Sequence, residues 1–402
     1  MNYEFPTINN ISDVLPAIEG RDEFTVAVKE GYTVINYNVM MADTFPDVYS
    51  DAGVAGCIFK NGQWYNKAAA IRRECRGIIF DTATGDIIRR PFHKFFNVNE
   101  REETQDHVVD LSRSHTILEK LDGSMIAPFI VNGQMIWGTK MGATDVAKPV
   151  EKFIEAHSEY RIYAKFMLSR GYTPIFEWCS RKQRIVLDYS EDQLILTAIR
   201  DVVSGRYMSR DLMIINAENY NIPVVRAFDP QTDMKEFIEY VRDLEDVEGF
   251  VVRFDDGHMI KLKCDWYVQI HKAKEAILQD RNIVELILDD KLDDIKAHLP
   301  AEDRDRLTYF ESQINSRILD RSAHLSDATN GEQYMGDRKY FALNRAQEYN
   351  SYSRAIVFSL WDDNSYERSS ELVRRTIRNN IGRNTKWEEL RDHWFEGVIY
   401  NA

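Results

Sequence analysis

The stretch TILEKLDGSMIAP, residues 116–128, holds a lysine between two apolar segments. The apolar residues on either side predict two β-strands. Lys120 stands between Leu118 and Leu121, where a lysine side chain rarely serves only to face water. Asp122 and Gly123 follow it directly. The stretch therefore predicts a sheet with a functional site where the two strands meet.

Strand patterns recur on both sides of this stretch, from residue 24 to residue 263. Asn132 and Gly133 predict a tight hairpin turn because both tolerate a positive φ, and residues 29–31 predict another turn. One long helix is expected at residues 145–170, ended by Gly171. These features predict an α+β domain with mainly antiparallel sheet. The expected strands are FTVAV (24–28), YTVINYNV (32–39), MIAPFIV (125–131), QMIWGTK (134–140), TPIFEWC (173–179), RIVL (184–187), QLILTAI (193–199), EGFVVRF (248–254) and HMIKLK (258–263).

After Trp266 the sequence changes to helical spacing, with an apolar stripe that includes Ile283, Ile287 and Leu288. We therefore expect a domain boundary near residues 265–275. This gives a first domain at residues 1–268 and an all-helical C-terminal domain at residues 269–402.

Composition limits the classes of protein that the chain can belong to. It has 402 residues and a formal charge of −14, which argues against a protein that coats nucleic acid unselectively. Its 4 cysteines lie far apart without zinc-ligand spacing. No stretch approaches the about 18 apolar residues of a membrane span, and no leader is recognised. The chain is expected to be cytoplasmic, without a membrane partner.

Charged residues occur repeatedly inside the predicted strands of the first domain. One alone is most often a solvated strand face, but eight together predict a cleft that gathers phosphates and a divalent cation. These residues are Arg76, Lys94, Lys120, Lys140, Glu177, Glu248, Lys261 and Lys263. By contrast, Phe92, Phe95 and Phe96 are expected to be core residues.

The hairpin at residues 248–263 has two possible registers. A three-residue loop at residues 255–257 sets Val251 opposite Lys261 and Gly249 opposite Lys263. A purine could then lie on Val251, but Glu248 would face the lysines only if Gly249 bulged. A two-residue loop would put Glu248 and both lysines on one face. The sequence leaves both registers open.

A role as a nucleophile would explain why a lysine stands at position 120. A lysine amine attacks only when it is neutral, and cations such as Lys261, Lys263 and a metal disfavour the ammonium form. Asp122 would supply a hard oxygen ligand for magnesium or its waters, and Gly123 would let the backbone approach a ligand closely.

These residues resemble the covalent nucleotidyltransferases, which include polynucleotide ligases and mRNA capping enzymes. KLDG at residues 120–123 matches their KxDG element, and FE (176–177), EGFV (248–251) and KLK (261–263) follow in the same order. ECRGIIF (74–80), RPFHKFFNVNE (90–100), RIVL and KLKCDWYV (261–268) resemble the tRNA-repair RNA ligases of T-even phages, and GDRKYFAL (336–343) resembles part of their helical domain. The resemblance implies an antiparallel-sheet nucleotidyltransferase domain, of the ATP-dependent ligase type, followed by a helical domain for RNA or tRNA specificity.

The resemblance also implies roles for individual residues. Lys120 would form the lysyl–AMP, and Tyr267 falls where the family needs a tyrosine for ligation. A hydrated magnesium, with manganese as a substitute, would be held by Asp122, Glu177 and Glu248, and Asp293 loosely matches a second cation site. The residues expected to bind ATP, the AMP donor, are Tyr37, Arg76, Lys94, Glu119, Lys120, Lys140, Glu177, Val251, Lys261 and Lys263.

The implied reaction seals the RNA 5′-phosphate and 3′-hydroxyl ends of a broken tRNA anticodon loop, and a separate kinase/phosphatase would prepare them. Residues 374, 375, 378, 383 and 386, all basic, are candidates for RNA phosphate contacts. Two departures stand out: residues 53–73 look like an insertion, and Leu121 replaces a common acid. The alternatives are a DNA ligase or a capping guanylyltransferase, and a non-catalytic nucleotide- or RNA-binding protein.

Overall fold

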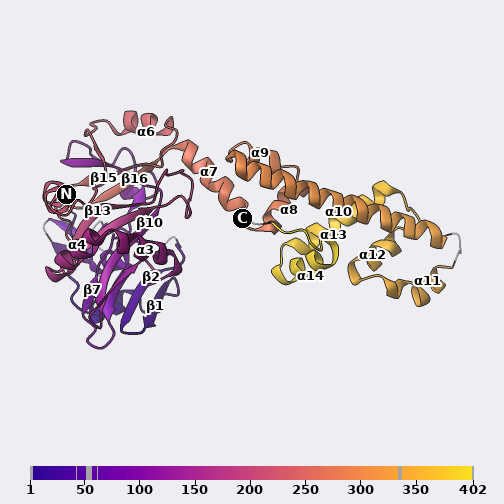
Figure 1. Ribbon diagram of the computed structural model, residues 1–402, viewed down its shortest axis with the longest axis horizontal. Helices are drawn as coiled ribbons and strands as arrows, with labels where there is room; N and C mark the ends of the chain where they lie inside the picture. Colours follow the sequence, from indigo (N-terminus) through magenta and orange to yellow (C-terminus); the bar gives the residue numbers. More distant parts are fainter. Residues whose placement is uncertain (1–2, 42, 51–56, 61, 334–336, 401–402) are drawn as a thin grey trace. The chain divides into compact units, whose positions relative to one another are not determined.

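In the computed structural model the chain divides into two compact units, residues 1–268 and 269–402. The structure describes all residues except 1–2, 42, 51–56, 61, 334–336 and 401–402. Among the described residues every strand belongs to the first unit, and the elements of the second unit are helical (Figure 1). The predicted combination of antiparallel sheet with a helical C-terminal region is therefore confirmed.

The first unit is built on four small sheets. Among the strands of the described residues only β8 and β16 pair in parallel, as the mainly antiparallel prediction requires. In sheet order the strands are β1 (Phe24–Lys29), β2 (Tyr32–Tyr37), β6 (Arg76–Asp81) and β7 (Ile87–Arg89); β11 (Gln134–Gly138), β10 (Ser124–Val131), β12 (Tyr172–Cys179) and β13 (Gln193–Asp201); β14 (Ala227–Phe228), β9 (His115–Glu119), β15 (Gly249–Phe254), β16 (Met259–Lys263) and β8 (Phe96–Asn97); and β3 (Tyr49–Ser50), β5 (Gln63–Asn66) and β4 (Cys57–Lys60).

Residues 120–123 connect two of these sheets. Strand β9 ends at Glu119 in the five-stranded sheet, where Phe250 is its register partner. Strand β10 begins at Ser124 in a four-stranded sheet, opposite Trp178. Gly123 fits this crossing because an added Cβ would lie 2.3 Å from the Trp178 carbonyl oxygen. The lysine of the opening stretch therefore stands at the junction of two sheets.

The predicted hairpin at Asn132 and Gly133 is confirmed. Both residues have a positive φ, 50° and 75°, which the tight turn between β10 and β11 needs. By contrast, the strand expected at residues 184–187 is wrong, because these residues form a loop between β12 and β13.

Helices cover the sheets of the first unit. The helix expected at residues 145–170 is broken: a 3₁₀ turn at Asp145–Ala147 precedes α3 (Lys148–Ala156), and α4 (Ser158–Ser169) follows a break at His157. With φ −127° and ψ 69°, His157 leaves the helical region, and side chains of both helices still reach one core. The other helices are α1 (Leu15–Ile18), α2 (Lys67–Glu74), α5 (Arg210–Glu218) and α6 (Met234–Arg242), and 3₁₀ turns lie at Ile11–Asp13 and Glu102–Thr104. Helix α7 (Asp265–Ala276) begins in this unit and continues past residue 268.

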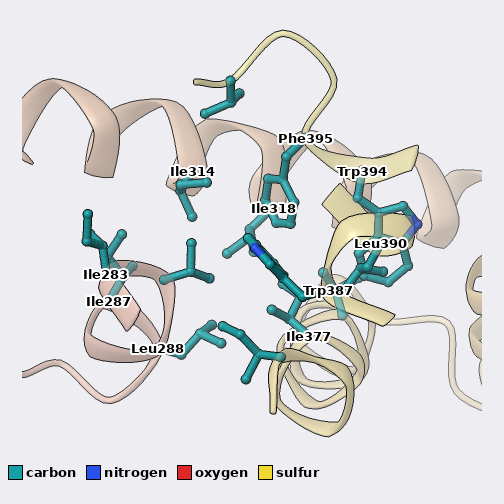
Figure 2. Packing of buried hydrophobic residues seen from close by; sticks show 14 of the residues in the cluster. Ile283, Ile287, Leu288, Ile314, Ile318, Ile377, Trp387, Leu390, Trp394 and Phe395 are labelled. Carbon is teal, nitrogen blue, oxygen red and sulfur yellow. The ribbon is translucent and has the colours of Figure 1, made fainter. Parts of the chain in front are cut away.

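The second unit buries a core of its own. Figure 2 shows the Trp387 and Phe395 rings among side chains of several helices, and the two ring centroids are 5.9 Å apart. The helices are α8 (Asp280–Leu288), α9 (Leu292–Lys296), α10 (Ala301–Gln333), α11 (Arg338–Asn344), α12 (Ser351–Ser359), α13 (Tyr366–Ile381) and α14 (Asn384–Trp394), with a 3₁₀ turn at Ala346–Glu348.

Parts of two sequence predictions lie outside the described residues. Positions 53–56 and 61 of the expected insertion are among these, and so is Gly336 of the GDRKYFAL segment. The described part of the insertion forms β4, β5 and most of α2. In the described chain, none of the helices combines the length and apolar character that crossing a bilayer requires.

Candidate active site

Lys120 lies at a pocket of about 240 Å³. Its backbone N–H donates to the Gly249 carbonyl at 3.0 Å, which ties the end of β9 to the start of β15. Its Nζ forms an ion pair with Glu248 Oε1 at 2.6 Å. The residues lining this Lys120 pocket are Arg76, Phe92, Phe95, Leu118, Glu119, Lys120, Leu121, Gly123, Met125, Glu177, Thr197, Val225, Val251, Met259 and Lys261.

The lining combines an apolar part with charged groups. Phe92 and Phe95 belong to it, so the prediction that they are core residues is wrong, whereas Phe96 is 1% exposed, as expected. Met259 also lines the pocket but was not among the expected site residues. Its position could have been predicted, because it lies two residues before Lys261 on one strand and therefore on the same face. The apolar lining suits a planar ring, and the charged lining suits an anion.

The hairpin of β15 and β16 has the three-residue loop. Val251 pairs with Lys261 and Gly249 with Lys263, and Gly257 in the loop has a φ of 91°. Gly249 itself has a φ of 136°, and an added Cβ would lie 2.0 Å from the Leu262 carbonyl oxygen. Only glycine adopts this backbone without strain.

The distortion at Gly249 resolves the position of Glu248. Its Oε1 lies 2.6 Å from Lys120 Nζ and 2.9 Å from Lys263 Nζ, although simple alternation would turn it away in this register. The carboxylate is 3% exposed and joins the end of β9 to β16. The structure thus brings Lys120, Glu248 and Lys263 together through a backbone conformation.

Four cations near Lys120 lack acidic partners. Within the described residues, no carboxylate lies within 4.0 Å of this cation cluster, which comprises Arg76, Lys94, Lys140 and Lys261. The Lys94 and Lys140 ammonium groups lie 5.8 Å and 5.1 Å from the centre of the Tyr37 ring. Arg76 Nη1 is buried and has no hydrogen-bond partner among the described residues.

The cation cluster perturbs its own members. Burial first, and then Lys94, Lys120 and Arg76, lower the pKa of Lys261 to about 7. Burial and neighbouring cations also lower the pKa of Lys94 and of Lys140. Like charges gathered without a counter-ion are typical of a binding site for a polyanion.

Asp122 is occupied by protein groups. Its Oδ2 accepts hydrogen bonds from the backbone N–H groups of Val186 and Leu187, both at 2.7 Å, and its Oδ1 accepts from the Tyr267 hydroxyl at 2.7 Å. Its own backbone N–H donates to the Tyr189 hydroxyl at 3.0 Å. The carboxylate is 3% exposed and does not line the Lys120 pocket. In this structure Asp122 anchors the 184–189 loop and α7.

Tyr267 lies in the first turn of α7 and is buried. Burial, reinforced by Glu248 and Asp122, raises the pKa of its hydroxyl, so the group remains a donor to Asp122. Its partner in this contact lies 145 positions earlier in the chain. The structure therefore places Tyr267 in contact with Asp122 of the KLDG segment, and Tyr267 is not among the residues that line the Lys120 pocket.

Of the four expected metal ligands, Glu177 on β12 lines the pocket. Glu119, which was expected to bind ATP, lines it too. Burial raises the pKa of Glu177 to about 7, Lys120 opposes this shift, and Glu248 adds to it. No group of three acidic, histidine or cysteine side chains in the described chain is arranged to hold an ion. Magnesium bound to a nucleotide needs only one or two carboxylates, because phosphates and waters supply the other ligands. Glu177 and Glu119 fit that requirement.

Asp293 belongs to the second unit. It lies on α9, where it is exposed and pairs with Lys296 at 3.3 Å. Its proposed role in binding a cation stays a prediction.

Comparisons with known proteins match the part of the chain that contains this site. A family model described as RNA ligase matches residues 74–267. A protein of Thermovibrio ammonificans named as an RNA ligase is 32% identical over 274 residues, which cover 64% of this chain and 70% of that protein. The chain belongs to the RNA ligase family. The predicted membership of the RNA ligases is thereby confirmed, and the likeness to tRNA-repair enzymes stays a prediction.

Two further proteins illustrate the range of similarity. A bifunctional polynucleotide kinase/RNA ligase by name, from Autographa californica nuclear polyhedrosis virus, is 26% identical over 249 residues, covering 56% of this chain but 35% of that protein. A solved structure described as an archaeal ATP-dependent RNA ligase has a TM-score of 0.43 at 13% identity, covering 93% of this chain and 76% of that one.

Proposed function

We propose that the protein is an ATP-dependent RNA ligase that joins a 5′-phosphate to a 3′-hydroxyl through lysyl–AMP and RNA-adenylate intermediates. The observation that carries this proposal is Lys120, at a pocket with an apolar lining and a cluster of cations without counter-ions. Family membership supports RNA as the acceptor. Residues 1–268 would then be the adenylyltransferase domain.

The pocket suits ATP in both its parts. The adenine ring would lie against Val251 and the neighbouring apolar side chains, which would exclude water from one face. Arg76, Lys94 and Lys140 would hold the outgoing pyrophosphate beside Tyr37, and Lys261 and Lys263 the α-phosphate. The unpartnered Nη1 of Arg76 supports this assignment because a buried donor without an acceptor is costly.

In the first step Lys120 Nζ attacks the α-phosphorus, an N–P bond forms, and the bond to the leaving pyrophosphate breaks. Glu248, which pairs with the ammonium form, is the nearest acceptor for the proton that Lys120 gives up. An oxygen of the RNA 5′-phosphate then displaces Lys120 from AMP. Finally the 3′-hydroxyl attacks the 5′-phosphorus and AMP leaves.

Each step is a displacement at phosphorus, so positioning and charge neutralisation dominate catalysis. Magnesium, or manganese in its place, would neutralise phosphate charge when bound. Glu177 is the residue we propose to hold the hydrated ion, and Glu119 lines the same pocket. Asp122 contributes by fixing the KLDG segment, and Glu248 by orienting Lys120 and Lys263.

We further propose that residues 269–402 select the RNA and that a broken tRNA is the substrate. Exposed arginines on and near α13 support a phosphate contact, although Arg378 already bonds to α8 through Leu288 and Asp289. The viral relative named as a kinase/ligase supports functional pairing with an end-healing kinase.

The test is to incubate the protein with magnesium and α-labelled ATP or GTP and to look for label on the denatured polypeptide. We expect label from ATP alone, which is lost in Lys120→Ala and kept in Lys165→Ala, a change at an exposed lysine of α4. Lys120→Ala should still seal RNA that is already adenylylated. Label from GTP would indicate a capping-type enzyme, and no label on folded, non-adenylylated protein would refute the proposal.

A further inference from the structure

Arg89, the last residue of β7, is fully buried. In the described chain its guanidinium forms no ion pair, and its hydrogen bonds go to backbone carbonyls. Its Nη2 donates to Gly77 at 2.9 Å and to Thr139 at 2.9 Å, and its Nε donates to Gly77 at 3.2 Å. Its Nη1 donates to Ala127 at 3.2 Å and Gly138 at 3.3 Å. One planar group thus joins β6, β10 and the end of β11.

The carbonyl of Gly77 is available to Arg89 because of a β-bulge. In the pairing of β2 with β6, Ile35 faces Ile78 but Asn36 faces Arg76, so Gly77 is the extra residue. Its φ of 89° fits this conformation. A bulge re-aims the neighbouring side chain, which here is Arg76 of the cation cluster.

The second carbonyl, that of Thr139, directly precedes Lys140 of the same cluster. The peptide of Lys140 also touches the bulge, because a Cβ added to Gly77 would lie 2.7 Å from the Lys140 carbonyl oxygen. Asn36 Nδ2 donates to that oxygen at 2.9 Å. Arg89 therefore fixes the backbone beside two cations that carry no acidic partner.

Simple packing does not account for this residue. Burial lowers the pKa of Arg89 to about 9, which leaves the guanidinium charged at neutral pH, and the described structure gives it no counter-ion. Burying a charge without an ion-pair partner costs free energy, which indicates a role beyond filling space. The Phe129 ring, 5.0 Å from the guanidinium carbon, gives only partial compensation.

We infer that Arg89 is a positioning residue for nucleotide binding. It holds Arg76 and Lys140 where the β- and γ-phosphates of ATP lie, without touching the nucleotide itself. This inference rests on the proposed function, since it assigns the triphosphate end of ATP to the cation cluster. It predicts a defect confined to the step that uses ATP.

The test compares Arg89→Lys and Arg89→Met with wild type in two reactions. One is lysyl–AMP formation at varied ATP concentration, and the other is sealing of pre-adenylylated RNA, which brings no triphosphate. Arg89→Lys keeps the charge and is the variant on which the test depends. The control is Arg90→Lys, because Arg90 is equally buried but bonds to Glu74, Val203 and Pro6.

We expect Arg89→Lys to raise the KM for ATP about tenfold or more, with a smaller change in kcat, and to leave sealing within about twofold of wild type. Arg90→Lys should lower Tm without moving the KM for ATP. An equal loss of both reactions in Arg89→Lys, an unchanged KM, or the same KM effect in Arg90→Lys would overturn the inference. Failure of the proposed function is distinguishable, because wild type would then form no lysyl–AMP.

Discussion

Removing the Tyr267 hydroxyl should destabilise the first unit, because that hydroxyl donates to a buried carboxylate. Tyr267→Phe leaves Asp122 Oδ1 without this bond, while Oδ2 keeps its two backbone donors. A hydrogen bond to a charged group contributes about 1.5–3 kcal/mol. The ring keeps its packing, so we expect the free energy of unfolding to fall by about 2 kcal/mol.

Tyr163 provides the matched control. Its ring is fully buried, and its hydroxyl has no hydrogen-bond partner in the described part of the chain. Tyr163→Phe removes the same atom without breaking a bond, so it should leave the stability unchanged or raise it slightly.

The assay is urea unfolding followed by tryptophan fluorescence and, separately, by circular dichroism. A double-mutant cycle of Tyr267→Phe with Asp122→Asn should give a coupling energy of about 1.5–3 kcal/mol. The reasoning is refuted if Tyr267→Phe is neutral, if the two tyrosine variants lose equal stability, or if the cycle shows no coupling.

Three further predictions concern pH, backbone strain and the second core. The folded-state pKa of Glu177, about 7, lies above its ordinary value of 4.5, so the stabilising contribution of the protonated carboxyl group is lost as the pH rises through that range. The unfolding free energy of the wild type minus that of Glu177→Gln should therefore decrease between pH 4.5 and 7, and a constant value would contradict this. Gly249→Ala should destabilise by at least about 2 kcal/mol in urea unfolding, and Gly20→Ala, which also has a positive φ but open space around it, by less than about 2. Leu390→Ala in the second core should cost about 2–5 kcal/mol and the exposed Leu319→Ala much less; equal losses on thermal unfolding would argue against the packing in Figure 2.

The sequence predicted the longer strands and the hairpin of the first unit well, because alternation and turn residues are local signals. The short strands β3, β4, β5, β7, β8 and β14 were not among the expected ones. Asn132 and Gly133 specify their turn by themselves. Residues 184–187 misled the prediction, since their β-branched residues suit a strand. Their backbone N–H groups instead bond to Asp122, a partner more than 60 positions away, and no local pattern records that competition.

The candidate site could be predicted where a charged side chain stands inside an apolar strand pattern. The sequence led to Lys120, Glu177 and the cation cluster, and the structure brings these together. It left the hairpin register open, because the loop length depends on backbone angles and Gly249 can leave the strand conformation. Arg89 was missed, since an arginine at a strand end is usually solvated and nothing local shows that four carbonyls surround it.

The cation cluster is a local concentration of positive charge on a protein whose net charge is negative. The whole protein carries a formal charge of −14. Salt screens charges over about 10 Å at 0.1 M, so at longer range the protein does not draw polyanions toward itself, and only at short range does the cluster attract them. Electrostatic steering, which speeds the encounter of many proteins with nucleic acids, would therefore act on an approaching polyanion only within about that distance of the cluster.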